Sequence, residues 1–275
     1  EAPIPASSGY TTVLRNIGSM ENKGLEVSLT SQNIRRGDVA WTTQFNASYN
    51  RNKVLKLTGG ADIIQGTNPI VGQRIIRENE PVNSFFGLVK LGTWSTQEEE
   101  QGKAFNKRPG DNKYLDVNND GAINDKDKVI IGNGNPDWYG SLVNTVTWKD
   151  LDLMIDLQFM LGNDVAFETK ATSQDRVGIT NVLKTVLDAW TPENQNTLIA
   201  QVRPSQAGLD RNSATDRIYD GSFLRGRNIV IGYNGFGRLL KTSKVSNYRV
   251  YASLQNLFVI TSYPGYDPEV SSSLD

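Results

Sequence analysis

Apolar and polar residues alternate with a period of two over much of the chain. Between residues 41 and 50, Trp41, Phe45 and Tyr49 mark the mostly apolar odd positions, whereas every even position is polar. Residues 151–161 repeat the pattern with apolar odd positions. Successive side chains of a β-strand point to opposite faces, so the pattern predicts strands with one apolar face. We predict six long strands, of which the third and fifth alternate least regularly: residues 20–32, 39–57, 138–148, 151–161, 222–233 and 247–261.

The connections between these strands alternate between short and long. Short turns are predicted at residues 35–38, 149–150 and 235–246, whereas residues 58–137 and 162–221 form two long loops. Every short turn therefore falls at one end of the strands and every long loop at the other. This asymmetry is typical of transmembrane β-barrels, which have short periplasmic turns and long extracellular loops. We predict an all-β chain whose antiparallel strands are part of a large transmembrane β-barrel, with residues 58–137 and 162–221 as extracellular loops.

Aromatic residues and helical spacing refine this picture. Aromatic side chains lie near the predicted strand ends, as in the girdles of membrane barrels: Trp41, Tyr49, Trp138, Tyr139, Trp148, Tyr233, Tyr248 and Phe258. Helical spacing is confined to residues 177–190, where apolar residues recur at intervals of three and four and Pro192 follows. We predict one helix over residues 177–190.

Composition excludes several classes of protein. The chain has 275 residues, with neither cysteine nor histidine, so disulfides, thiolate metal sites and Ser-His-Asp catalysis are excluded. A formal net charge of -1 without basic clusters gives no indication of a nucleic-acid partner. No apolar run is long enough for a membrane-spanning helix. Residues 1–9 do not resemble a signal peptide, so the targeting segment of an exported protein would lie outside this sequence.

Residues 116–127 match the layout of a calcium-binding loop. Such loops place oxygen ligands at positions one, three and five, glycine at six, a backbone carbonyl at seven and an acid at twelve. The predicted metal ligands are Asp116, Asn118, Asp120, the carbonyl of Ala122, Asn124 and Asp127. Aspartate at the last position replaces the usual bidentate glutamate. The loop is therefore a predicted structural Ca²⁺ site, and a turn held by side-chain-to-backbone hydrogen bonds is the alternative.

Several segments, in a constant order, resemble one protein family. They are residues 16–27 (NIGSMENKGLEV), 46–54 (NASYNRNKV), 116–123 (DVNNDGAI), 130–133 (IIGN) with Pro136, 223–225 (FLR) with 232–233 (GY), and 256–270 (NLFVITSYPGYDPEV). Together they resemble the SusC/RagA family of TonB-dependent outer-membrane transporters. The last segment is similar to the terminal signature of that family, so residues 1–275 look like the C-terminal segment of its β-barrel.

The resemblance implies a function and a set of partners. Members of the family form a barrel of about 22 strands with an N-terminal plug. A SusD-like lipoprotein covers the barrel, TonB supplies energy through the N-terminal part, and the substrates are oligosaccharides or peptides. The resemblance also implies the bacterial cell outer membrane and contact with its lipid. The plug, the earlier strands and the last strand have no counterpart here, and six strands cannot close a barrel.

Two other functions are compatible with the residues alone. The first is a secreted soluble β-sandwich that binds glycans and holds a structural calcium. The second is a glycosidase built on Asp152 and Asp156, although both lie on the polar face of a predicted strand, where a lumenal position is the simpler explanation. We therefore predict that the chain is not an enzyme.

Two further groups of residues are candidates for binding or for structure. Loop aromatics could stack on sugars or pack the loops: Phe85, Phe86, Trp94, Trp138, Trp190 and Tyr219. Arg225 and Arg227 are expected in the barrel lumen, paired with carboxylates such as Asp152 or Asp156.

Overall fold

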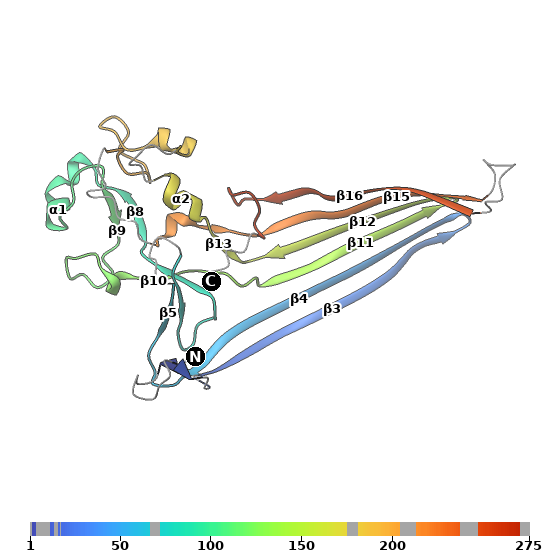
Figure 1. The fold of residues 1–275 in the computed structure, drawn as a ribbon, viewed down its shortest axis with the longest axis horizontal. Coiled ribbons are helices and arrows are strands. Elements are labelled where there is room, and N and C mark those ends of the chain that lie inside the picture. Colours follow the sequence, from blue (N-terminus) through green and yellow to red (C-terminus); the bar gives the residue numbers. More distant parts are fainter. Residues whose placement is uncertain are drawn as a thin grey trace.

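Six long antiparallel strands form the largest sheet of the chain (Figure 1). In the computed structural model the described residues are 2–3, 12–13, 16, 18–66, 72–174, 181–203, 213–236 and 247–269. The strands of the large sheet are β3 (Gly18–Arg36), β4 (Val39–Leu57), β11 (Trp138–Trp148), β12 (Leu151–Leu161), β15 (Phe223–Phe236) and β16 (Asn247–Thr261). Their order in space is β16-β15-β12-β11-β4-β3, so each strand pairs with the next long strand of the chain.

The observed strands confirm the six that alternation predicts, with differences at two of them. β3 is longer than predicted because it pairs with β4 along its whole length, from Gly18 opposite Leu57 to Arg36 opposite Val39. β15 continues to Phe236, and a β-bulge lies between Gly226 and Asn228. A bulge inserts one residue and shifts the alternation of side chains. This explains why the sequence of the fifth strand alternates poorly.

The two long loops contain short elements of their own. They are β5 (Ile63–Gln65), β6 (Arg74–Ile76), β7 (Ser84–Gly87), β8 (Lys90–Thr93), β9 (Asn112–Tyr114), β10 (Val129–Asn133), β13 (Asp164–Ala166), β14 (Ile218–Asp220), α1 (Glu99–Ala104) and α2 (Glu168–Ser173). Four 3-10 helices accompany them at Thr96–Glu98, Asp125–Asp127, Lys184–Asp188 and Thr215–Arg217. β10, β7, β6 and β5 form a four-stranded sheet, and β1 (Ala2–Pro3) pairs with β2 (Thr12–Val13).

Most of the buried apolar side chains belong to the loops and not to the large sheet. Leu88, Ala214 and Tyr114 form a small core and are at most 6% exposed. Leu88 joins the two loops directly, because its amide donates to the carbonyl of Ser213 and its carbonyl accepts from the amide of Thr215 (2.8 and 3.0 Å, N to O). The long loops therefore pack as one body at one end of the strands (Figure 1).

The predicted helix over residues 177–190 is wrong where the structure describes it. Residues 177–180 lie outside the described residues, and the remainder contains only the 3-10 helix η4 (Lys184–Asp188). Leu183 and Ala189, on either side, have extended backbone, with ψ of 145° and 153°. Leu187 is 84% exposed, whereas Trp190 is buried among the loops. The apolar residues of this segment therefore do not share one helical face. None of the described helices is long and apolar enough to cross a membrane.

Candidate functional site

One face of the large sheet carries an exposed apolar band. The register of the strands places these side chains on the same face, and each is more than a third exposed: Leu25, Val27, Leu29, Trp41, Trp138, Trp148, Leu151, Leu161, Leu224, Ile231, Val250, Leu254, Phe258 and Ile260. Val250 is 64% exposed. A continuous apolar surface of this extent marks contact with lipid or protein. In a membrane barrel it is the face that meets the hydrocarbon.

Aromatic side chains lie at both ends of this band. Tyr49 and Trp138 contact each other at the loop end, with ring centroids 4.8 Å apart and ring planes tilted by 41°. Tyr233 and Tyr248 contact each other at the turn end, with centroids 6.2 Å apart. Near the turns, the indole of Trp41 donates to Asn144 Oδ1 (3.0 Å), which lets a polar residue lie on the apolar face with its hydrogen bond satisfied. The predicted girdles of the barrel wall are present at both rims.

The opposite face of the sheet is polar and carries ion pairs between strands. Arg227 contacts Asp156 Oδ2 through Nε (2.8 Å) and Nη2 (2.6 Å). Arg249 Nη2 lies 2.7 Å from Asp152 Oδ2, and Asp152 Oδ1 also accepts from the side-chain Nδ2 of Asn234 at 2.8 Å. The pairing expected for Arg227 is therefore found. Asp152 and Asp156 hold β12 against its neighbours, as the simpler explanation of these carboxylates predicts.

Arg225 has other partners than those predicted. Its Nη2 contacts Asp267 and Glu269, at 2.7 and 2.8 Å, and the guanidinium is 7% exposed. Gln158 also donates to Glu269 (3.3 Å). The segment after β16 therefore turns back over the polar face at its loop end. Sequence alternation cannot locate this contact, because residues 262–269 belong to no strand.

Charge reversal tests the pairing of Asp156 with Arg227. Asp156→Arg or Arg227→Asp alone should lower the yield of folded receptor, because each leaves two like charges in contact on the polar face; the cost is about 1–3 kcal/mol. The double reversal should recover most of the yield. Folding is measured by heat-modifiable mobility in gels after refolding of the receptor that contains this chain. A double variant no better than the worse single variant would show that the two side chains are not coupled.

A cleft of about 880 Å³ lies where β3 and β4 meet the loops. Six asparagines line it: Asn22, Asn50, Asn52, Asn79, Asn133 and Asn135. Charged side chains and a tyrosine ring also line it, among them Glu21, Lys23, Arg51, Lys53, Glu80, Asp137 and Tyr139. Carboxamides offer donors and acceptors together, so this surface suits the hydroxyls of a glycan as well as peptide groups.

The two loops are joined by a buried charge cluster. Lys90 Nζ lies 2.9 Å from Asp216 Oδ2, with side chains 8% and 7% exposed. Lys170 donates to the carbonyl of Asp216 and to the hydroxyl of Tyr219. Burial lowers the pKa of Lys90 and of Lys170 from the ordinary lysine value, and the charge of Asp216 opposes that shift. Asp216 therefore balances two desolvated ammonium groups.

The predicted calcium loop is organised by its own hydrogen bonds. Asp116 accepts from the amides of Asp120 (3.3 Å) and Gly121 (2.9 Å), and Gly121 has the positive φ (79°) that this position requires. Asp120 accepts from the amide of Ala122, at 3.0 Å. In the first half of the loop the carboxylates of Asp116 and Asp120 thus accept from backbone amides that follow them, which curls the chain.

The second half of the loop fits a metal ion less well. Asp127 is fully buried and accepts from the amides of Val117 (3.0 Å) and Asn124 (2.8 Å). The carboxamide of Asn124 donates to the carbonyl of Ala122 (3.1 Å), which is one of the predicted ligands. Within the described residues no three acidic side chains converge as a metal site. The residues therefore fit calcium only in part, and the alternative of a hydrogen-bonded turn is equally compatible with these contacts.

The loop aromatics mostly pack against other loop residues. Phe85, Phe86, Trp94 and Trp190 are between 3% and 6% exposed. Tyr219 packs edge-on against Phe167, with centroids 6.1 Å apart. Trp138 belongs to the apolar face of β11. These rings therefore stabilise the loops and the wall, which is the structural alternative that the sequence left open.

Comparison with known proteins identifies the family. The chain is 33% identical over 276 residues to TonB-dependent receptor P3 of Formosa agariphila. This match covers 98% of the chain and 27% of that receptor. It is 30% identical over 285 residues to TonB-dependent receptor SusC of Bacteroides thetaiotaomicron, covering 99% of this chain and 26% of SusC. The chain belongs to the SusC/RagA family of TonB-dependent receptors. As part of such a receptor, it is located in the outer membrane.

The fold of a solved SusC/RagA structure agrees. The structure of the RagAB peptide transporter superposes with a TM-score of 0.79 and 23% identity, over 98% of this chain and 28% of that chain. No family model matches the sequence. The chain spans about a quarter of the length of the curated SusC/RagA relatives that it matches. The soluble β-sandwich is not favoured, because the long strands form one sheet with an open apolar face.

Proposed function

We propose that this chain forms part of the wall and the mouth of a SusC-like importer of nutrient oligomers. The observation that carries the proposal is the single sheet with one apolar and one polar face, with both long loops gathered at one end. Six strands cannot close a barrel, so transport belongs to the larger receptor. In that receptor residues 58–137 and 162–221 are the extracellular loops, and residues 1–275 are the C-terminal segment of the barrel.

The proposed partners follow from the family. A SusD-like lipoprotein would cover the mouth, and TonB would supply energy through a part of the receptor that precedes this chain. The relative RagAB is described as a peptide transporter, and this supports peptides as substrates. The asparagines of the cleft beside β4 support oligosaccharides as well, so oligosaccharides and peptides are both proposed as substrates.

Energised uptake tests this proposal. Cells that express the whole receptor with its lipoprotein should take up labelled peptides or oligosaccharides with saturable kinetics. Uptake should stop when a protonophore collapses the proton gradient or when TonB is absent. Equal uptake with and without the receptor, or uptake indifferent to TonB, would contradict an importer of this kind.

We also propose that residues 116–127 hold a structural Ca²⁺. Calcium bound to the loop should raise the temperature at which the loop unfolds, since a ligand that binds only the folded state stabilises it. Asp120→Asn should remove most of this effect, whereas Asp125→Asn is the matched control, because its side chain pairs with Lys128 instead (2.7 Å). Metal analysis with and without chelator and thermal melting provide the measurements. Protein that takes up no calcium at millimolar supply would exclude the site.

A further inference from the structure

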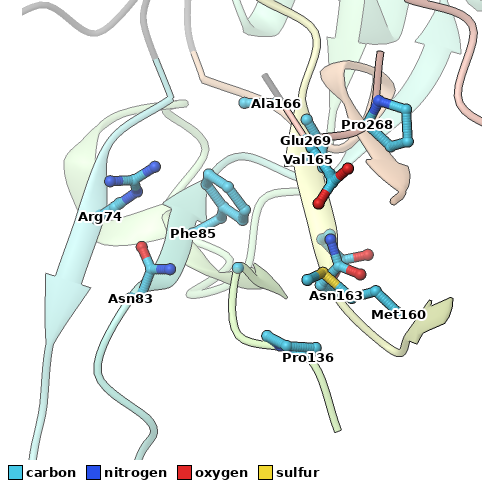
Figure 2. Close-up of a pocket in the computed structure, with 12 residues that line it drawn as sticks. Arg74, Asn83, Phe85, Pro136, Met160, Asn163, Val165, Ala166, Pro268 and Glu269 are labelled. Carbon is cyan, nitrogen blue, oxygen red and sulfur yellow. The ribbon is translucent and has the colours of Figure 1, made fainter. Parts of the chain in front are cut away.

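A second cavity, of about 450 Å³, lies where the polar face of the sheet meets the loops. Met160 at the end of β12 and Glu269 of the segment after β16 contribute one side, and Arg74 of β6 with Phe85 of β7 contributes the other (Figure 2). The cavity therefore draws on three separate parts of the chain. Its volume falls within the roughly 300–1,000 Å³ of small-molecule sites.

Arg74 brings an uncompensated positive charge to this cavity. Its guanidinium carbon lies 5.5 Å from the centroid of the Phe85 ring, and its buried Nε has no hydrogen-bond partner. It forms no ion pair with any residue that the structure describes. The Arg74 side chain thus keeps hydrogen-bond donors that no described residue occupies, and a carboxylate fits a guanidinium through two parallel hydrogen bonds.

The opposite wall offers acceptors. Asn163 is 5% exposed, and its Oδ1 has no hydrogen-bond partner. Its Nδ2 lies beside Gly221, and the residue lines the cavity. Asp164 follows, and its Oδ2 accepts from the amide of Asn133 (2.8 Å), but no basic side chain of the described residues pairs with it. Burial and the charge of Asp220 raise the pKa of Asp164. A positively charged group next to Asp164 would oppose this shift of its pKa.

The cavity thus holds two opposite charges that do not pair with each other. Glu269 does not supply the missing partner for Arg74, because it already contacts Arg225. A neutral glycan would leave both charges uncompensated, and an acidic glycan would satisfy only Arg74. A ligand with a carboxylate at one end and an ammonium at the other satisfies both walls, since each half-buried charge then gains a partner of opposite sign.

We propose that this cavity binds the charged ends of a short peptide, with the carboxylate on Arg74 and the ammonium on Asp164 and Asn163 Oδ1. The proposal rests on the importer function proposed above and selects peptides among its substrate classes. Asn163 and Asp164 lie at the start of the second long loop, just after β12, and Arg74 lies in the first, so a bound peptide would bridge the two loops next to the barrel wall.

Capped peptides test each charge separately. The probes are trialanine, N-acetyl-trialanine and trialanine amide, and the sample is the whole receptor in detergent, measured by calorimetry. Each cap should weaken binding by at least about tenfold, because it removes one charge-assisted hydrogen-bonded contact. Arg74→Met, which keeps the packing on Phe85, should abolish the difference in affinity between trialanine and trialanine amide. Asp164→Asn should abolish the difference in affinity between trialanine and N-acetyl-trialanine.

Arg77→Met is the matched control. Arg77 also lies over a phenylalanine ring, 5.6 Å from the centroid of Phe86, but it is paired with Asp62 and does not line the cavity. Replacing Arg77 should leave unchanged both affinity differences between trialanine and its two capped forms. Absence of trialanine binding, or binding that ignores the caps and the Arg74 variant, would overturn the proposal. TonB-dependent glycan uptake without peptide binding would contradict the peptide site and still support the importer function. Peptide binding without energised uptake would contradict the importer function and still support the peptide site.

Discussion

Replacing Asp216 with asparagine should loosen the joint between the two long loops by about 3–5 kcal/mol. The carboxylate of Asp216 balances Lys90 at 2.9 Å, and its own backbone carbonyl accepts from Lys170. Without the carboxylate, the desolvated ammonium groups of Lys90 and Lys170 remain beside Arg217 with no negative charge to balance them. Native-state hydrogen exchange on the whole receptor should show at least about a hundredfold loss of protection at the amides of Leu88 and Thr215, which connect the loops.

The reciprocal variant separates the charges from the packing. Lys90→Met should cost less than Asp216→Asn, because Asp216 then still faces Lys170, while the methionine fills the space of the lysine stem. Lys103→Met is a surface control, since Lys103 is more than half exposed and, among the residues that the structure describes, forms ion pairs with Glu99 and Glu100 alone. If Asp216→Asn and Lys103→Met gave the same exchange rates, the buried cluster would not be what holds the loops together.

The sequence predicts the barrel wall well for a physical reason. A strand that separates lipid from a polar lumen must alternate, so the pattern of residues 151–161 reports the fold directly. β11 and β15 alternate less regularly, and in β15 the bulge between Gly226 and Asn228 interrupts the alternation. The turns at residues 37–38 and 149–150 are short, so they also leave a local signal in the sequence.

The loops and the candidate sites leave no such signal. Lys90 and Asp216 meet although 126 positions separate them, and neither belongs to a periodic pattern. The cavity at Arg74 depends on residues from a loop, a strand end and the segment after β16. The helical spacing of residues 181–190 is a coincidence of apolar residues that pack in different directions. These contacts join residues that are far apart in the chain, so the local pattern of one sequence does not predict them.

The substitution Ile155→Arg should destabilise the closed barrel by about 2–4 kcal/mol, which is the cost of a cation on the lipid face near the bilayer midplane. Ile155 lies in the middle of β12 on the apolar face, opposite Ile229 of β15. The neighbouring Met154 points to the polar face, opposite Thr145 and Val230. Met154→Arg is therefore a control with the same added charge at the same depth.

The two variants together decide which face meets lipid. Refolding of the whole receptor into lipid vesicles, followed by heat-modifiable gel mobility, should show a lower folded fraction for Ile155→Arg and a near-normal one for Met154→Arg. The difference arises because lumenal water solvates the cation at position 154, whereas hydrocarbon cannot solvate it at position 155. The opposite ranking would mean that the polar face is turned outward. The Asp156–Arg227 and Asp152–Arg249 pairs would then lie in lipid, and the cavity at Arg74 would lie outside the lumen.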